Sequence, residues 1–121
     1  MIGVDTGFFF ALREGDPGAL ALFEREEIVV SVLTRFELKR LAHRRGLPWT
    51  ELGLLFGRST TELDLTAEAA EEAASISHAT GMPALDALIL AGLLAAGCRT
   101  IYTRDEHLLR FGRKDVDIVR I

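Results

Sequence analysis

The stretch Pro83-Ala-Leu-Asp-Ala-Leu-Ile-Leu-Ala-Gly-Leu-Leu-Ala-Ala-Gly97 is apolar on almost every side when it is wound into a helix. A helix that is apolar all round is buried rather than laid on a surface. Its one charged residue is Asp86. An ionised carboxylate among apolar side chains is costly unless it is paired or binds a metal. Asp86 therefore either belongs to the first turn of its helix, where the helix dipole favours an acid, or faces a functional site.

The rest of the chain alternates short strands with longer helices. Runs of apolar or β-branched residues predict strands at 2–4, 28–30, 61–65, 99–103 and 117–121. Capping residues and apolar periodicity predict helices that start at 8 and at 48, helices over 17–23, 32–45, 67–80 and 84–97, and one or two helical turns at 107–111. This alternation is typical of an α/β fold whose mostly parallel sheet is covered by helices on both faces.

Length and composition indicate one globular domain over residues 1–121. Hydrophobic residues make up 49% of the chain and charged residues 26%, which provides a core and argues against disorder. The apolar run at 84–97 is shorter than the ~20 residues that a membrane-spanning helix needs, so no membrane association is expected. The single cysteine, Cys98, excludes an internal disulfide and a multi-cysteine zinc site.

The N-terminus and the net charge bound the location and the partners. Residues 1–5 lack the basic region and the cleavage site of a signal peptide. Together with the single cysteine, this predicts a reducing, cytoplasmic location. A net charge of −4 excludes binding to nucleic acid through overall positive charge, so any such contact is expected to be local.

Four acidic residues occupy comparable places in this pattern. Asp5 and Asp105 each follow the end of a predicted strand. Glu37 lies in the second turn of the helix after the second strand, and Asp86 lies near the start of its helix. In open parallel sheets, ligands bind beyond the carboxyl ends of the strands. The four carboxylates, which come from four distant segments, are therefore expected to converge.

Converged carboxylates repel one another, and their pKa values rise unless cations neutralise them. Hard oxygen ligands of this kind suit Mg²⁺ or Mn²⁺. A cation held there can activate water and stabilise charge on a phosphoryl group. Thr6 and Thr103 add hydroxyls beside Asp5 and Asp105, where they can orient a carboxylate or a ligating water. The sequence contains neither a phosphate-binding loop nor a dinucleotide-binding fingerprint.

These residues fall within four short motifs. The motifs are Val4-Asp5-Thr6-Gly7, Ser31-Val-Leu-Thr34-Arg-Phe-Glu37-Leu38, Leu85-Asp86-Ala-Leu-Ile-Leu-Ala91 and Tyr102-Thr103-Arg-Asp105. In this order and with these separations, the sequence resembles the PIN domains, and within them the small VapC-type ribonuclease toxins of prokaryotic toxin–antitoxin pairs. The resemblance covers essentially the whole chain. Residues 112–117 depart from the tail expected after the fourth motif, which bears on RNA and antitoxin contacts more than on chemistry.

The resemblance implies a three-layer α/β/α fold with a five-stranded parallel sheet. It also implies hydrolysis of RNA phosphodiester bonds that depends on Mg²⁺ or Mn²⁺. The implied catalytic residues are four metal ligands and one helper hydroxyl: Asp5, Glu37, Asp86 and Asp105, with Thr103. The implied partners are a second copy of the chain, in a homodimer, and a cognate VapB-like antitoxin that silences the site.

Cationic side chains near these acids are candidate RNA contacts. Arg40 and Arg44 follow Glu37 on the same helix, and Arg104 directly precedes the fourth acid. Such side chains can contact phosphate next to a metal site. The alternative for the helix is a solvated face on which Glu37 and Arg40 form an ion pair.

Two further groups of residues lie outside the four motifs. The three histidines share no ligand spacing and are not predicted to be catalytic, although His107 is near Asp105. Trp49, Leu52 and Phe56 belong either to the core or to a groove that binds a partner, and exposure of an apolar patch there would favour the groove.

Two alternatives to a nuclease stay open. A PIN-like module could bind nucleic acid without useful turnover, and its binding would then not depend on metal. A different α/β phosphotransfer fold also places an acid after the first strand. However, dehalogenase-like phosphatases need a second aspartate where Gly7 stands, and receiver domains need paired acids and a late lysine that this sequence lacks.

Overall fold

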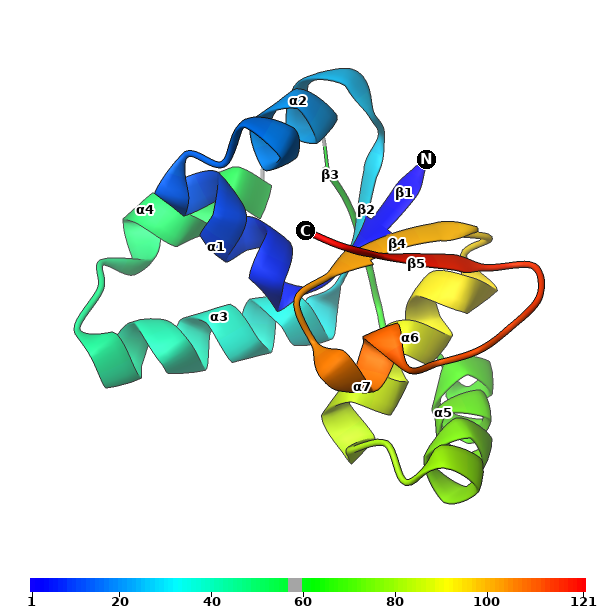
Figure 1. The fold of residues 1–121 in the computed structure, drawn as a ribbon. Helices are drawn as coiled ribbons and strands as arrows, with labels where there is room; N and C mark the ends of the chain where they lie inside the picture. The colour runs from blue at the N-terminus through cyan, green and yellow to red at the C-terminus, as the bar shows by residue number, and fades with distance from the viewer. Residues whose placement is uncertain (57–59) are drawn as a thin grey trace.

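The structure is a computed structural model and describes residues 1–56 and 60–121. Its strands are β1 (Ile2–Val4), β2 (Ile28–Ser31), β3 (Thr60–Leu63), β4 (Thr100–Thr103) and β5 (Asp117–Arg120). Its helices are α1 (Thr6–Glu14), α2 (Pro17–Arg25), α3 (Val32–Arg45), α4 (Trp49–Gly53), α5 (Ala67–Thr80), α6 (Ala84–Ala95) and α7 (Glu106–Leu109). A 3₁₀ turn at Leu54–Phe56 follows α4. Figure 1 shows the strands in the middle of the molecule, between two groups of helices.

The five strands of the described residues form one sheet in the order β3-β2-β1-β4-β5, and every pairing in it is parallel. β1 lies at the centre, where Val4 is paired with Val30 of β2 and with Tyr102 of β4. The chain first extends the sheet on one side of β1 and then on the other, so its direction reverses between β1 and β4. In open parallel sheets, such a reversal leaves a crevice at the carboxyl ends of the strands.

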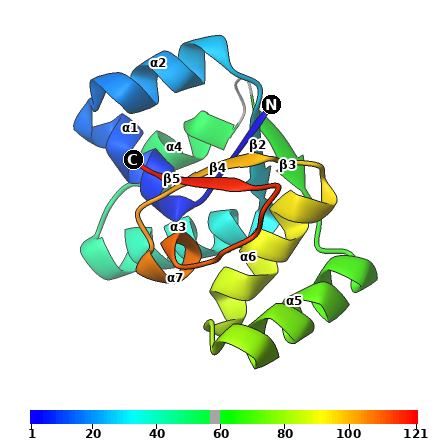
Figure 2. The ribbon, with the colours of Figure 1, turned by 45° about the vertical axis from the view of Figure 1, so that its right-hand side comes forward.

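The core is divided into two layers by alternation along the strands. On β2, Ile28 and Val30 belong to one layer, whereas Val29 belongs to the other, as the two-residue period of a strand requires. The first layer packs against α1, α2 and the 3₁₀ turn, and the second against α5, α6 and α7. Figures 1 and 2 show these helices on opposite sides of the sheet. The predicted α/β/α architecture, with helices on both faces, is confirmed.

Close packing against the sheet fixes the position of α6. Ile89, Leu90 and Leu93 of this helix are almost fully buried. The close approach of α6 to β1 depends on Gly3, because a Cβ atom there would lie only 3.2 Å from side-chain atoms of Leu93 and Ile101. The first turn of α6 therefore lies beside the carboxyl edge of the sheet. Among the described residues, no helix is both long enough and apolar enough to cross a membrane.

The predicted boundaries need small corrections. The helix expected from residue 8 begins at Thr6, because the Asp5 side chain accepts a hydrogen bond from the Gly7 N–H and caps it. The helix expected over 84–97 ends at Ala95, and Gly97, at φ 91°, turns the chain toward β4. The strand expected at 61–65 occupies Thr60–Leu63. The helices predicted over 32–45 and 67–80 are confirmed, with Ser31 and Thr66 as their N-caps.

Candidate active site

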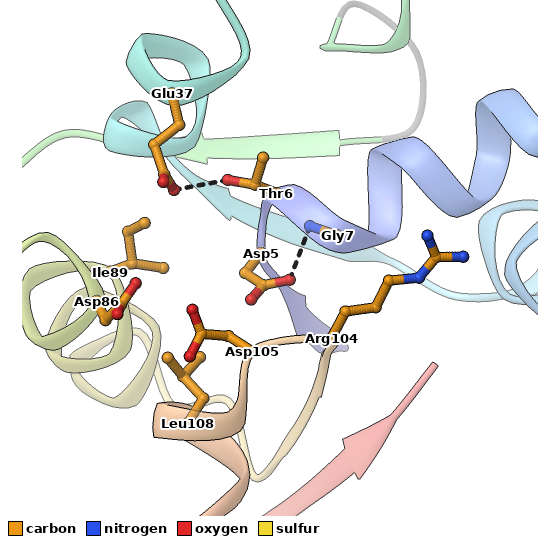
Figure 3. Close-up of a pocket in the computed structure, with 9 residues that line it drawn as sticks. All are labelled: Asp5, Thr6, Gly7, Glu37, Asp86, Ile89, Arg104, Asp105 and Leu108. Atoms are coloured by element: carbon orange, nitrogen blue, oxygen red, sulfur yellow. Dashed lines mark hydrogen bonds between the residues drawn. The ribbon is translucent and has the colours of Figure 1, made fainter. Parts of the chain in front are cut away.

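Four carboxylates from four separate elements line one cavity of about 220 Å³ at the carboxyl edge of the sheet. Asp5 follows β1, Asp105 follows β4, Glu37 comes from α3, and Asp86 comes from the first turn of α6. Figure 3 shows all four side chains turned toward the same space. The remaining lining residues are Thr6, Gly7, Ile89, Arg104 and Leu108. The predicted convergence is therefore present in the fold.

Asp5 is held rigidly at the base of the cavity. The residue is 7% exposed, and one oxygen of its carboxylate accepts a hydrogen bond from the Gly7 N–H at 3.1 Å. The other oxygen accepts a hydrogen bond from the hydroxyl of Thr103, which is fully buried. The same Thr103 hydroxyl accepts a hydrogen bond from the Asp105 N–H at 2.9 Å. One hydroxyl therefore fixes the relative positions of two of the acids.

Glu37 is oriented by Thr6, the second of the two threonines predicted to lie beside the acids. The Thr6 hydroxyl donates a hydrogen bond to Glu37 Oε1 at 2.6 Å, as drawn in Figure 3. Thr6 is the first residue of α1, directly after Asp5, so this bond joins the helix that Asp5 caps to the helix that carries Glu37. The Glu37–Arg40 ion pair, which was the alternative to phosphate contact for this helix, is not among the ion pairs of the described residues. Instead, the Arg40 guanidinium lies over the Phe36 ring, at 5.8 Å from its centroid.

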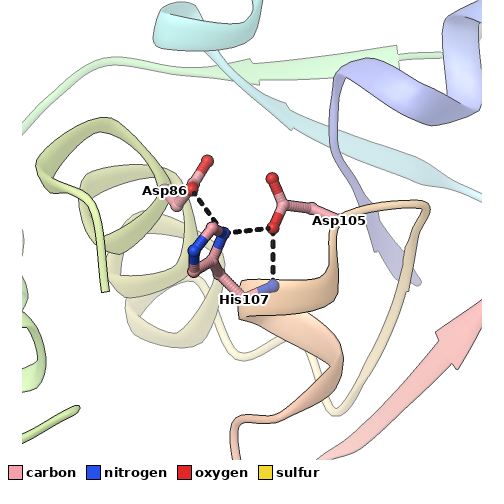
Figure 4. Close-up of side chains that lie close together, drawn as sticks. All are labelled: Asp86, Asp105 and His107. Carbon is pink, nitrogen blue, oxygen red and sulfur yellow. Dashed lines mark hydrogen bonds and ion pairs between the residues drawn. The ribbon is translucent and has the colours of Figure 1, made fainter. Parts of the chain in front are cut away.

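Asp86 and Asp105 face each other across the cavity, with His107 beside them (Figure 4). His107 Nδ1 lies 3.1 Å from Asp105 Oδ1 and 3.7 Å from Asp86 Oδ2. One donor atom from each of the three side chains lies within 4.8 Å of the other two. Asp105 also caps α7 by accepting a hydrogen bond from the His107 N–H at 2.7 Å. Contacts between residues close in sequence thus position Asp105 and His107 beside Asp86.

The electrostatics of the cavity disfavour full ionisation. The pKa of Asp5 is raised to about 6, chiefly by burial and to a lesser extent by the charges of Asp105 and Glu37, while the hydrogen bonds from Thr103 and Gly7 oppose the shift. The pKa of Asp86 is also raised to about 6, chiefly by burial and then by Asp105 and Glu37, while His107 opposes the shift. A bound cation would lower the pKa values of Asp5 and Asp86, because positive charge stabilises the ionised carboxylates.

The raised pKa values predict that the metal-free chain loses thermal stability as the pH rises from 4 to 7. A carboxyl whose pKa is about 6 in the folded chain and 3.8 in the unfolded chain holds its proton more tightly when folded. Its contribution to stability is therefore complete below about pH 4 and is lost as the pH passes 6. Thermal unfolding in chelator across this range, with Asp86→Asn for comparison, measures the effect. A wild-type decline no steeper than that of Asp86→Asn would contradict it.

Close packing around Gly7 and an apolar wall complete the cavity. A Cβ atom at Gly7 would lie 2.9 Å from Arg104 Cβ and 3.2 Å from the Arg104 backbone nitrogen, so glycine lets the start of α1 meet the loop after β4. Ile89 and Leu108 are buried and form the apolar wall. The Arg104 guanidinium points away from the acids in Figure 3 and forms an ion pair with Glu14 at 2.8 Å.

The basic residues of α3 lie outside this cavity. Arg40 and Arg44 are exposed and are not among its lining residues. Arg40 instead lines a groove of about 560 Å³ with Val32, Arg35, Phe36, Lys39, His43 and Trp49. Leu52 and Phe56 are buried, whereas Trp49 is half-buried and faces this groove. The three residues thus divide between the core and the groove.

Sequence reasoning missed the part that His107 takes in the site. The pattern of strands and helices places acids at strand ends, but it does not say which way a side chain in the first turn of a short helix points. The available signal was the spacing Asp105-x-His107, because a residue two positions after an N-cap lies on the first turn beside the cap. Ile89 and Leu108 were also missed, since apolar residues of a cavity wall look like core in a sequence.

The donor set of the cavity fits a divalent cation. It offers oxygen ligands from four carboxylates, two of them held by threonine hydroxyls. Several carboxylates in so small a space are the ligand type that Mg²⁺ and Mn²⁺ take in proteins. Among the described residues, the group of acids and histidines whose donor atoms are spaced for a metal ion is Asp86, Asp105 and His107. Asp5 and Glu37 line the same cavity but lie outside this group.

Comparisons with known proteins agree with this architecture. A model of the PIN domain matches residues 2–114. No curated protein matches the chain by sequence. Among solved structures, VapBC2 from Rickettsia felis, bound to a DNA fragment from its promoter, matches with a TM-score of 0.78 and 15% identity, over 100% of this chain and 99% of that chain.

Two further structures have the same fold at low identity. DNA-bound VapBC from Salmonella typhimurium matches with a TM-score of 0.78 and 18% identity, over 99% of this chain and 98% of that chain. VapC20 from Mycobacterium tuberculosis, described as a toxin that cleaves the sarcin–ricin loop, matches with a TM-score of 0.70 and 23% identity, over 88% and 91% of the two chains. At these identities the likeness establishes the fold.

Proposed function

Because the chain belongs to the PIN domain family, we propose that it is a metal-dependent endoribonuclease that hydrolyses phosphodiester bonds of RNA. The observation that carries the proposal is the convergence of four carboxylates, from four separate elements, on one cavity. Membership of this family removes the alternative of a dehalogenase-like or receiver-type phosphotransfer fold. A nucleic-acid-binding module without turnover remains the competing function.

In this proposal, the metal ligands are the four acids Asp5, Glu37, Asp86 and Asp105, and the ion is Mg²⁺ or Mn²⁺. When bound, such an ion supplies a more acidic water and stabilises charge on a phosphoryl group. The chain's own contribution is to hold the ligands in place. Thr103 and Thr6 fix Asp5 and Glu37 through their hydroxyls, and the buried side chains of Ile89 and Leu108 form an apolar part of the lining.

RNA contacts in this proposal lie around the mouth of the cavity. Arg104 lines the cavity, and release from Glu14 would let its guanidinium turn toward a phosphate. Arg40 and Arg44 lie farther along α3, on the helix that carries Glu37, and would contact RNA beyond the cleaved bond. Exposed cations of this kind contribute through phosphate contacts rather than through base recognition.

The biological setting that we propose is that of a VapC-type toxin with a cognate VapB-like antitoxin. The support is the fold shared with a chain of two VapBC structures and with VapC20. Homodimerisation and action of residues 1–121 as one domain belong to the same proposal. A cytoplasmic location is supported by Cys98, which is a free and buried thiol.

RNA cleavage by the purified chain tests the proposed function. Single-stranded and structured RNAs are incubated with Mg²⁺, with Mn²⁺ or with chelator, beside an Asp5→Asn variant. Cleavage that needs a divalent cation and is lost in the variant is expected, because Asp5 is the most buried of the four acids that line the cavity. Cleavage that survives in chelator or in the variant would contradict the proposal. RNA binding without cleavage, insensitive to metal, would favour the binding module.

A further inference from the structure

The ring of His107 lies where a nitrogen could join two carboxylates in binding a cation. We propose that His107 Nδ1 is a ligand of the ion bound by Asp86 and Asp105, and that this nitrogen makes the site prefer Mn²⁺ to Mg²⁺. The inference rests on the proposed metal-dependent function. It adds a ligand that the pattern of acids does not predict, and a choice between the two ions.

The distances suit shared coordination. Ligand atoms at ~2.1 Å from an ion of octahedral geometry lie about 3 Å apart when they are adjacent. His107 Nδ1 is 3.1 Å from Asp105 Oδ1 and 3.7 Å from Asp86 Oδ2. Figure 4 shows that Nδ1 is the ring nitrogen that faces both carboxylates. The contact with Asp105 already matches this spacing, and small side-chain movements would bring the Asp86 oxygen onto the same ion, because all three donor atoms lie within 4.8 Å of one another.

Local structure holds the ring in this place. His107 lies in the first turn of α7, where its own N–H binds the Asp105 cap. The next residue, Leu108, is buried against the second core layer and fixes the rotation of the short helix. The His107 side chain is 49% exposed, so an ion from solvent can reach the ring without opening the core.

The nitrogen changes which ion is favoured. Mg²⁺ keeps oxygen ligands and demands near-ideal octahedral geometry, whereas imidazole nitrogen suits transition-metal ions. Carboxylates alone would bind both ions through oxygen. One imidazole added to two carboxylates therefore shifts the relative affinity toward Mn²⁺. A His107 that only donates a hydrogen bond to the carboxylates would raise or lower the affinity for both ions together.

Pulsed electron paramagnetic resonance on the Mn²⁺-loaded full chain tests the ligand directly. We expect coupling of Mn²⁺ to one ¹⁴N nucleus in the wild type, its loss in His107→Ala, and its retention in His78→Ala. His78 is exposed on α5 and provides a matched removal of an imidazole outside the cavity. Titration with each ion measures the selectivity. Mn²⁺ affinity is expected to fall about tenfold or more in His107→Ala, with a smaller change for Mg²⁺.

The outcomes separate this inference from the proposed function. Mn²⁺ binding that requires Asp86 but has no ¹⁴N coupling would overturn the inference and leave the metal site in place. Equal loss of Mn²⁺ and Mg²⁺ affinity in His107→Ala would also overturn it, because a hydrogen-bonding role affects both ions. If the wild type binds neither ion, both the inference and the proposed function fail.

Discussion

Replacement of Asp86 by asparagine is expected to abolish RNA cleavage and, at the same time, to make the metal-free chain more stable. Cleavage should fall by more than about a hundredfold. Replacing a residue that only supports a metal ligand already lowers activity or metal affinity by about 10–100-fold, and loss of a ligand itself should cost more. Mg²⁺ and Mn²⁺ should also lose most of their stabilising effect on the fold, since a ligand stabilises only the state to which it binds.

The gain in stability follows from the environment of Asp86. At pH 7 its carboxylate is ionised in the folded chain, although burial, Asp105 and Glu37 all oppose the charge and raise its pKa to about 6. Asparagine has nearly the same shape and no charge, so it removes this repulsion. One pKa unit corresponds to ~1.4 kcal/mol, and partial exposure reduces the effect, so we expect a gain on the order of 1 kcal/mol.

Thermal unfolding in chelator at pH 7 measures the gain, which should raise the melting temperature by about 3–6 °C for a chain of this size. Asp117→Asn is the matched control. Asp117 is an exposed aspartate at the amino end of β5, at the edge of the sheet opposite the cavity. A decrease in stability with Asp86→Asn, or full cleavage by this variant, would show that the carboxylate does not oppose folding or does not bind the ion.

The placement of the four acids could be predicted from the sequence because it depends on topology alone. Asp5 and Asp105 follow strands that end at the same edge of a parallel sheet, so their convergence requires no knowledge of side-chain packing. Asp86 was recognisable because a charge in an otherwise apolar helix needs a reason. Glu37 required only that α3 begin where β2 ends, as it does at Ser31 and Val32.

The partners of these acids could not be predicted in the same way. The contact of His107 with Asp86 depends on the angle at which the single turn of α7 meets α6, and a sequence pattern does not determine such an angle. The bond from Thr6 to Glu37 depends on the depth at which α3 packs beside α1. Arg104 has a suitable place in the sequence, yet its guanidinium pairs with Glu14 because two exposed charges lie within reach.

The double role of the Thr103 hydroxyl leads to the second large effect. Valine has almost the same shape as threonine but can neither donate a hydrogen bond to Asp5 nor accept one from the Asp105 N–H. In Thr103→Val, Asp5 and Asp105 would therefore both lose the hydroxyl that fixes their positions. Cleavage at pH 7 should fall by about 10–100-fold, the usual cost of losing a group that orients a metal ligand. An unpaired part-buried N–H should also lower the free energy of unfolding by about 1–3 kcal/mol.

A shift of the pH profile distinguishes this role from simple loss of folded protein. The Thr103 hydrogen bond lowers the pKa of Asp5 against the effect of burial, so its removal should raise that pKa from its present value of about 6. Asp5 must be ionised to bind a cation, and the acidic limb of the activity profile should therefore move to higher pH. Part of the lost activity should return in alkaline buffer.

Two matched variants complete the test of Thr103. Thr103→Ser keeps the hydroxyl and should retain most of the activity and the original pH profile. Thr100→Val removes a threonine hydroxyl at the other end of the same strand, away from the cavity, and should leave both unchanged. If Thr103→Val cleaves RNA as fast as the wild type over the same pH range, the hydroxyl does not set the ionisation of Asp5. Asp5 and Asp105 would then have to be positioned by backbone donors alone. These donors are the Gly7 N–H, which binds the Asp5 carboxylate, and the His107 N–H, which binds the Asp105 carboxylate.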